Sequence, residues 1–209
     1  MEAKPITLQD WPTFTVEFAL LGSEVSLKTW IALLRGINVG GARTVPMKDL
    51  VTALADAGFN DVRTYIQSGN VVFQAQRGTP RSIGTQIARV IEERFGFDVP
   101  VMTLSDAEFT AAIRANPFTQ AISDPRTLHL CFLAETPSSP DLASLTKLKS
   151  PNESFALKGK VFYLHTPDGA GNSKLAARVE RALGVDTTCR NWRTVNQLLE
   201  MCAQRPGPK

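Results

Sequence analysis

The chain of 209 residues contains 43% hydrophobic and 21% charged residues, which is enough apolar material for one large domain or two small ones. No apolar run approaches the roughly 20 residues that span a bilayer, and no basic segment followed by an apolar one marks a signal peptide. We therefore expect a cytoplasmic protein without a membrane partner. The net charge of +3 permits an anionic ligand but is too small to require nucleic acid.

The first 26 residues show no sustained hydrophobic period, and we interpret them as an N-terminal extension that is disordered in part. The following residues, 29–34, are almost entirely apolar, which predicts a strand covered on both faces. A helix from Met47 to Gly58 comes next. The rest of this half is predicted to contain strands at 62–66 and 70–75, a helix from Thr79 to Gly96, a strand at 99–104 and a short helix from Ser105 that ends before Asn116.

The predicted elements of the first half follow the order β-α-β-β-α-β-α. The elements from Thr127 onward are predicted to follow the same order. This is the order of a split β-α-β, ferredoxin-like unit with one added helix. We therefore predict an α+β fold of two tandem ferredoxin-like units. The predicted elements are strands at 128–133, 154–157, 161–165 and 185–189, and helices at 139–148, at 175–183 and behind a Thr194–Gln197 capping box.

The predicted domain limits follow from this repeat. The first unit comprises residues 27–117, a linker comprises 118–126, the second unit comprises 127–205, and a tail comprises 206–209. The strands at 29–34 and 128–133 both lack the polar alternation of a one-sided sheet. We therefore expect the two units to share an interface that covers these strands.

The cysteines Cys131, Cys189 and Cys202 form no C-x-x-C pair. Because their number is odd, a disulfide framework is disfavoured, and we predict that all three are reduced thiols. Cys131 and Cys202 lie in apolar patterns typical of a core. The neighbouring Arg190 could lower the pKa of Cys189, but no histidine lies near it in the sequence, so we predict that Cys189 is structural and not catalytic.

Several motifs resemble those of the bacterial domain-of-unknown-function family 1697. They are RGINVGG at 35–41, YIQSGNVVF at 65–73, ERFGFDVPV at 93–101, NPF at 116–118, DGAGNSKL at 168–175 and RNWRTV at 190–195. The resemblance covers about residues 27–204 and leaves out the N-terminal extension. It implies an α+β fold of ferredoxin-like units and no assigned activity. The family usually has a small residue at position 189.

A glycine-bearing loop follows the first strand and comprises Arg35, Gly36, Asn38, Gly40 and Gly41. Its glycines permit positive φ, and its amides, a helix N-terminus and the nearby Arg43 could together bind an anion. The alternative is a loop whose glycines only let the chain cross the sheet edge. The G-x-G-x-x-G spacing of a dinucleotide fingerprint is absent.

A second glycine-bearing segment precedes the helix predicted from Leu175 and comprises Asp168, Gly169, Gly171, Ser173 and Lys174. Amides, a hydroxyl and an ammonium at one helix N-terminus favour phosphate. The segment is not a Walker A loop, because its lysine follows the serine. The alternative is a capped glycine turn without a ligand.

Two further polar clusters are candidates for ligand contact. Gln67, Ser68 and Asn70 form a predicted hairpin tip, for which a turn is the simpler interpretation. The second cluster, Arg190, Asn191 and Trp192, could stack on a base or grip a phosphate. The alternative is that the indole anchors the last helix to the core.

Together these clusters predict a phosphate-bearing ligand, either a nucleotide or a nucleic acid, in a cleft between the two units. No cofactor or metal is predicted, because the two histidines lack Cys, Asp or Glu at ligand spacing. The alternative is an enzyme acting on a small anionic substrate. A third hypothesis is a structural or protein-interaction module. The oligomeric state stays open. Residues predicted to face the cleft are Arg35, Asn38, Ser173, Lys174, Arg190 and Asn191, and the acid or base of the enzyme alternative would be Asp168, Lys174 or Tyr65.

Overall fold

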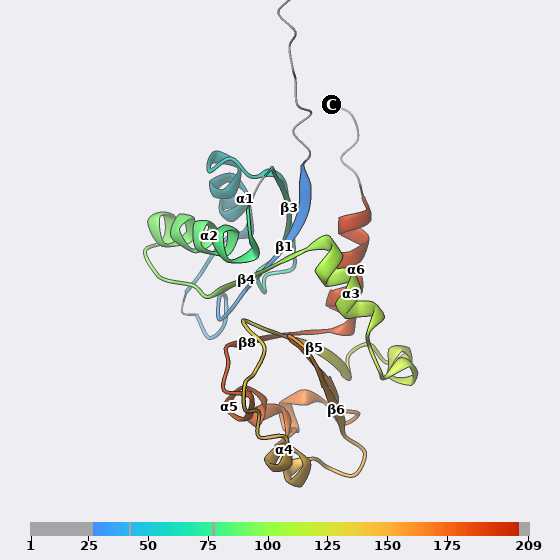
Figure 1. Cartoon of the computed structure of the whole chain (residues 1–209). Coiled ribbons are helices and arrows are strands. Elements are labelled where there is room, and N and C mark those ends of the chain that lie inside the picture. Colours follow the sequence, from blue (N-terminus) through green and yellow to red (C-terminus); the bar gives the residue numbers. More distant parts are fainter. Residues whose placement is uncertain (1–26, 42, 77, 205–209) are drawn as a thin grey trace, which may run out of the picture.

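The computed structural model describes residues 27–41, 43–76 and 78–204. The N-terminal extension at 1–26 and the tail at 206–209 lie outside these residues. The described chain has an α+β fold with two four-stranded antiparallel sheets and six α-helices (Figure 1). No helix in these ranges is long and apolar enough to cross a membrane.

The first sheet contains four strands with a helix on each of its two crossover connections. Its strands are β1 (Lys28–Leu34), β2 (Asn60–Tyr65), β3 (Asn70–Ala75) and β4 (Val101–Ser105), and its helices are α1 (Met47–Asp56), α2 (Pro80–Phe95) and α3 (Asp106–Arg114). The strand order is β2-β3-β1-β4, so β1 pairs with both β3 and β4. Helices α1 and α2 cover one face of the sheet, and α3 leads away toward the second half (Figure 1).

The second sheet repeats this arrangement. Its strands are β5 (Leu128–Leu133), β6 (Ser154–Lys158), β7 (Val161–His165) and β8 (Thr187–Asn191), in the order β6-β7-β5-β8. The 3-10 segment η1 (Thr119–Ser123) joins the halves. The other helical segments are α4 (Leu142–Leu148), η2 (Ala170–Asn172), η3 (Ala176–Arg178), α5 (Val179–Leu183) and α6 (Trp192–Ala203).

Local capping signals set the helix ends predicted in the first half. Thr79 Oγ1 accepts a hydrogen bond from the Ser82 N–H at 3.2 Å, ahead of α2. Gly96 ends this helix in the left-handed conformation with φ of 80°. Ser105 and Glu108 cap each other's N–H groups at the start of α3, as predicted. The structure confirms these predicted helix ends. They could be predicted because each cap depends only on residues within one helical turn.

The helix predicted over 175–183 is interrupted, and this expectation is wrong. The segment forms the 3-10 turn η3 and then the five-residue helix α5. Arg178, the last residue of η3, has φ of −112°, which breaks the regular helical geometry ahead of α5. The apolar side chains still reach one core at helical spacing, which explains the pattern in the sequence; they are Leu175, Val179 and Leu183.

Both central strands are covered on both faces, as their apolar sequences predict. One face of each strand packs on the helices of its own half, and the other face packs into a core shared by the two halves. The shared core also contains residues of α3 and α6, and Phe109 of α3 stacks on Phe132 of β5 with 5.5 Å between the ring centroids. The strand residues that face the shared core include Ile31 and Leu33 of β1 and Leu130 and Phe132 of β5.

Candidate ligand-binding cleft between the two sheets

The side chain of Asn38 closes the glycine-bearing loop after β1. Its Nδ2 donates to the carbonyl oxygens of Val45 at 3.0 Å and Gln67 at 2.8 Å, and its Oδ1 accepts from the Val45 N–H at 2.8 Å. Asn38 itself has φ of 56°, in the left-handed region. The loop 35–41 is thereby tied to the turn between β2 and β3. These contacts use the amide of Asn38 for the loop itself, which supports the structural alternative for this residue.

The β2–β3 turn is likewise held by its own polar groups. Asn70 is fully buried, and its Nδ2 donates to the Tyr65 carbonyl at 3.1 Å and to Ser68 Oγ at 3.0 Å. Gly69 lies directly against β1, because a Cβ atom at this position would be 2.6 Å from the Cβ of Leu34. The turn therefore requires glycine for close approach as well as for its φ of 72°.

Arg190 on β8 links this region to the second sheet. Its Nε donates to Asn70 Oδ1, and its Nη2 donates to the carbonyl oxygens of Leu34 at 2.8 Å and Ser68 at 3.2 Å. Its Nη1 donates to Thr188 Oγ1 at 2.9 Å. Burial lowers the pKa of Arg190 to about 10, and the side chain stays cationic at neutral pH. The guanidinium is thus occupied by protein acceptors.

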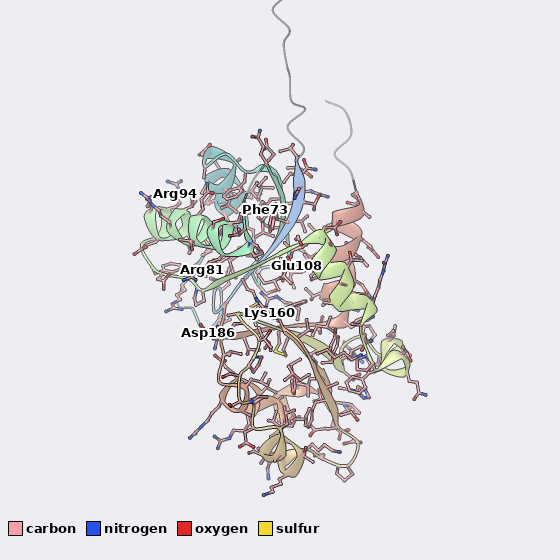
Figure 2. The ribbon with its side chains drawn as sticks, in the orientation of Figure 1. Phe73, Arg81, Arg94, Glu108, Lys160 and Asp186 are labelled. Atoms are coloured by element: carbon pink, nitrogen blue, oxygen red, sulfur yellow. A yellow bond between two sulfur atoms is a disulfide. The ribbon has the colours of Figure 1, made fainter. Side chains whose placement is uncertain are left out.

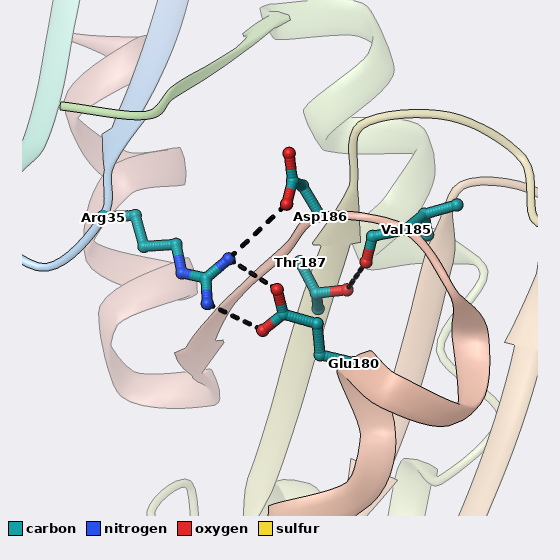
Figure 3. A network of polar contacts seen from close by, with 5 residues as sticks. All are labelled: Arg35, Glu180, Val185, Asp186 and Thr187. Carbon is teal, nitrogen blue, oxygen red and sulfur yellow. Dashed lines mark hydrogen bonds and ion pairs between the residues drawn. The ribbon is translucent and has the colours of Figure 1, made fainter. Parts of the chain in front are cut away.

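A second cation, Arg35, also bridges the two halves. Its Nη1 and Nη2 each donate at 2.7 Å to one carboxylate oxygen of Glu180, and Asp186 Oδ1 lies 3.9 Å from Nη1 (Figure 3). This bidentate geometry is the strong form of an arginine–carboxylate pair. Because both side chains are about two-fifths exposed, solvent screens the pair.

The segment from Asp168 to Lys174 does not lead into a regular helix. Ser173 has extended backbone geometry, and its Oγ accepts from the Ala176 N–H at 2.9 Å. Asp168 accepts from Asn152 Nδ2 at 2.9 Å. The expected joint contribution of amides and helix dipole is therefore lost, because the nearest α-helix begins only at Val179 and has five residues.

Asn191 and Trp192 begin the last helix, α6. Asn191 is its N-cap, since Asn191 Oδ1 accepts from the Thr194 N–H at 3.0 Å. The predicted helix start behind Thr194 is therefore wrong by one turn, because Asn191 supplies the capping oxygen three residues earlier. Trp192 is buried in the shared core, which supports the anchoring alternative.

The prediction that all cysteines are reduced thiols is wrong. Cys131 and Cys189 form a disulfide, because β5 and β8 place them directly opposite each other. This pairing could not be predicted from the sequence, because 58 positions separate the two cysteines and β8 begins two residues later than predicted. The structure also brings His129 onto β5 opposite Asn191, so a histidine is near this pair. Cys202 remains a thiol. Burial, and to a smaller extent the negative charge of Asp106, raises its pKa to about 12.

A cleft of about 810 Å³ lies between the two sheets. Its first wall comes from the start of α2 and from β4, and its second wall comes from the start of β8 and the loops beside it. In Figure 2, Lys160 and Asp186 lie where the second half faces the first. The charged lining residues are Arg35, Arg81 and Lys160 with Asp98, Glu135 and Asp186, and Thr79, Thr103, Thr187 and Thr188 add hydroxyl groups.

Of the residues singled out in the sequence, Arg35 lines this cleft. Asn38, Asn70 and Arg190 lie together at the end of β1, beside it, and Lys174 is exposed elsewhere on the second half. Arg81 and Lys160 were missed by the sequence reasoning. The capped start of the helix at Thr79 was a usable signal for Arg81, whereas Lys160 looks like any exposed hairpin residue until the two sheets are placed together.

Comparison with known proteins places the fold and the family. No curated protein matches the chain. A solved structure of a conserved bacterial protein from Streptococcus pneumoniae is 22% identical, with a TM-score of 0.65, and the match covers 85% of this chain and 99% of that one. This similarity shows a shared fold. An unknown protein from Galdieria sulphuraria is 15% identical with a TM-score of 0.25, covering 79% and 99% of the two chains, too low a similarity to support an argument.

A family model described as "Protein of unknown function (DUF1697)" matches residues 27–163. This range is well over half of the chain and includes the loop after β1, the β2–β3 turn, all of the first sheet and most of the second. The resemblance noted in the sequence motifs is therefore confirmed, and the chain belongs to the DUF1697 family.

Proposed function

We propose that the protein binds a small phosphate-bearing ligand of the nucleotide class in the cleft between the two sheets. The observation that carries this proposal is the cleft itself, whose walls combine three cations with apolar surface. Its volume of about 810 Å³ is in the range that holds small molecules. Apolar walls suit a base, and the cations suit a phosphate.

The phosphate is expected on the side of Arg81 and Lys160. In the described part of the chain, neither side chain makes an ion pair or a hydrogen bond, whereas Arg35 is already neutralised by Glu180. Arg81 also lies in the first turn of the 16-residue helix α2, where the helix dipole favours an anion. An available cation at a helix N-terminus and a second one, Lys160, on the β6–β7 hairpin therefore support a phosphate subsite.

The carboxylates of the cleft favour a nucleotide over a nucleic acid. Asp98, Glu135 and Asp186 balance the three cations, so the lining has no net charge. A polyanion would be repelled by these carboxylates, whereas the hydroxyl groups of a ribose can donate hydrogen bonds to them. A single phosphate group with a sugar attached fits this mixed lining.

We also infer that each sheet with its helices is a ferredoxin-like unit. In each half, the first strand lies between the third and fourth, and the second lies at the edge beyond the third. This order supports the division into residues 27–117, a linker at 118–126 and residues 127–205.

The two alternatives differ in their support. Asp168, Lys174 and Tyr65, the acid or base candidates of an enzyme, do not line the cleft, and no specific observation favours catalysis. The structural alternative is supported for particular motif residues. Asn38, Arg190 and Trp192 all use their side chains to hold loops, sheets or helices together.

Isothermal titration of AMP, ATP, pyrophosphate and a short oligonucleotide tests the proposal. The nucleotides should bind, and Arg81→Gln or Lys160→Gln should weaken binding by about 1.5 to 3 kcal/mol through loss of a charge-assisted hydrogen bond. Arg94→Gln is the matched control, because Arg94 is exposed at the opposite end of the same helix (Figure 2). Binding should also weaken with salt.

The other outcomes separate the alternatives. Absence of nucleotide binding, or an equal loss in Arg94→Gln, would remove the case for this cleft. Tighter binding of the oligonucleotide than of the nucleotides would favour a nucleic acid. A selective loss in Lys174→Ala would instead place the phosphate at the 168–174 segment.

A further inference from the structure

The disulfide between Cys131 and Cys189 is asymmetric in its exposure. The two residues lie directly opposite each other on β5 and β8. Cys131 is completely buried in the core of the second half, whereas Cys189 is exposed. We propose that the pair is a reversible thiol–disulfide exchange site, in which Cys189 presents the sulfur that reacts with small thiols in solution.

The strand that carries Cys189 has other attachments, so the site can open while the protein stays folded. β8 is an edge strand, and its backbone pairs with β5 from Thr187 to Asn191. On the opposite side of the strand, the Arg190 guanidinium bonds to Leu34 and Ser68 in the first half. The ladder and these hydrogen bonds do not depend on the sulfur–sulfur bond. Reduction should therefore leave β8 in place.

The chemistry requires only a thiol as reductant and a small disulfide as oxidant. A thiolate attacks Cys189 Sγ, the protein disulfide breaks, and Cys131 leaves as a thiolate that takes a proton from water. A second thiolate then attacks the small-molecule sulfur of the mixed disulfide and releases Cys189. Two thiols are oxidised to one disulfide, and the protein disulfide is reduced to two thiols. The reverse sequence restores the bond.

Burial decides which sulfur is attacked. Exchange requires in-line access of the incoming thiolate to a sulfur atom. Cys131 is covered by Leu133, Phe162 and Leu164 in the same core cluster, so solution thiols meet only Cys189. The mixed disulfide should therefore form at Cys189 and not at Cys131.

The test uses the full-length chain with Cys202→Ala, which leaves two cysteines. The protein is equilibrated in glutathione buffers of different reduced-to-oxidised ratio, quenched with acid and alkylated. Mass spectrometry then gives the number of alkylated thiols. We expect the thiols of Cys131 and Cys189 to appear together as the buffer becomes more reducing. Both thiols should disappear again when the protein is returned to the oxidising buffer. Circular dichroism should show the same fold at both ends of the series.

Two trapping variants then identify the reactive sulfur. With oxidised glutathione, Cys131→Ser should form a glutathione adduct at Cys189 at least roughly tenfold faster than Cys189→Ser forms one at Cys131. Peptide mapping of the parent protein, quenched part-way through reduction, gives the same information if a variant does not fold. Equal adduct rates, adducts mainly at Cys131, reduction that occurs only in denaturant, or failure of the bond to form in oxidised glutathione would each overturn the proposal.

Discussion

Nη2 of Arg190 donates a hydrogen bond to the carbonyl oxygen of Leu34 at 2.8 Å, although 156 positions separate the two residues. This contact joins the edge strand β8 of the second sheet to the central strand β1 of the first. The same guanidinium also satisfies Asn70 Oδ1 and the Ser68 carbonyl. A single, partly buried cation thus connects the end of β1, the β2–β3 turn and β8.

Replacement of Arg190 should therefore destabilise the whole chain. Arg190→Ala leaves several buried acceptors without a donor, and we expect the free energy of unfolding to fall by about 3 kcal/mol. Arg190→Lys should lower the free energy of unfolding less, because the lysine ammonium keeps the positive charge and some hydrogen-bond donors. It cannot replace all the donors of the guanidinium. Urea denaturation measures both. Arg193→Ala is the control, since Arg193 is exposed three residues away, and an equal loss there would contradict the assigned role.

The ion pair between Arg35 and Glu180 should contribute much less. Both side chains are about two-fifths exposed, so a double-mutant cycle with Arg35→Ala and Glu180→Ala should give a coupling energy of about 1 kcal/mol or less. The coupling should shrink as salt is added. A parallel cycle on the more exposed pair Arg89–Glu93 should give a smaller value. A coupling energy that exceeds the loss in Arg190→Ala would reverse this ranking of the two contacts.

Gly69 should tolerate substitution less well than Gly96, although both glycines have a positive φ. Gly69 has φ of 72° and Gly96 has φ of 80°, but only at Gly69 would a new Cβ meet another atom, the Cβ of Leu34 at 2.6 Å. Gly96→Ala should lower the free energy of unfolding by about 1 kcal/mol through backbone strain, and Gly69→Ala should lower it by about 2 to 3 kcal/mol. Thermal and urea unfolding of the two variants make the comparison. Equal losses would mean that β1 shifts to make room.

Stability should depend on pH through His129. Burial lowers its pKa below the ordinary value of 6.5, although a backbone hydrogen bond at Thr127 opposes this. The unfolded chain therefore binds a proton more readily than the folded protein. The stabilisation is complete above pH 6.5 and is lost as the pH falls through the lower folded-state pKa.

Urea denaturation at pH 8 and pH 5 measures this dependence. In His129→Gln the difference in unfolding free energy between the two pH values should shrink. His165→Gln replaces the only other histidine of the sequence and is the matched control. A reduction of the pH dependence in His165→Gln alone would show that His129 is not the titrating group.

Much of the local structure could be predicted from the sequence because its causes are local. The Thr79 and Ser105 caps act within one turn, and the apolar residues of β1 and β5 require cover on both faces wherever they lie. The failed prediction of a continuous helix over 175–183 has a different cause. The spacing of Leu175, Val179 and Leu183 records that they face one core, and a broken helix satisfies this as well as a continuous one.

The sequence by itself determined the α+β class, the repeated element order and the family, because periodicity, caps and motifs are properties of neighbouring residues. The tertiary structure alone decided the roles of the polar residues. Asn38, Arg35 and Arg190 have the chemistry of ligand contacts, but the fold gives each a protein partner. The partners of Asn38 lie within the first half, and those of the two arginines lie across the two halves. The packing of the two halves placed Arg81 and Lys160 on one cleft, and the pairing of β5 with β8 placed Cys131 against Cys189. Such distances depend on the tertiary structure and not on spacing along the chain.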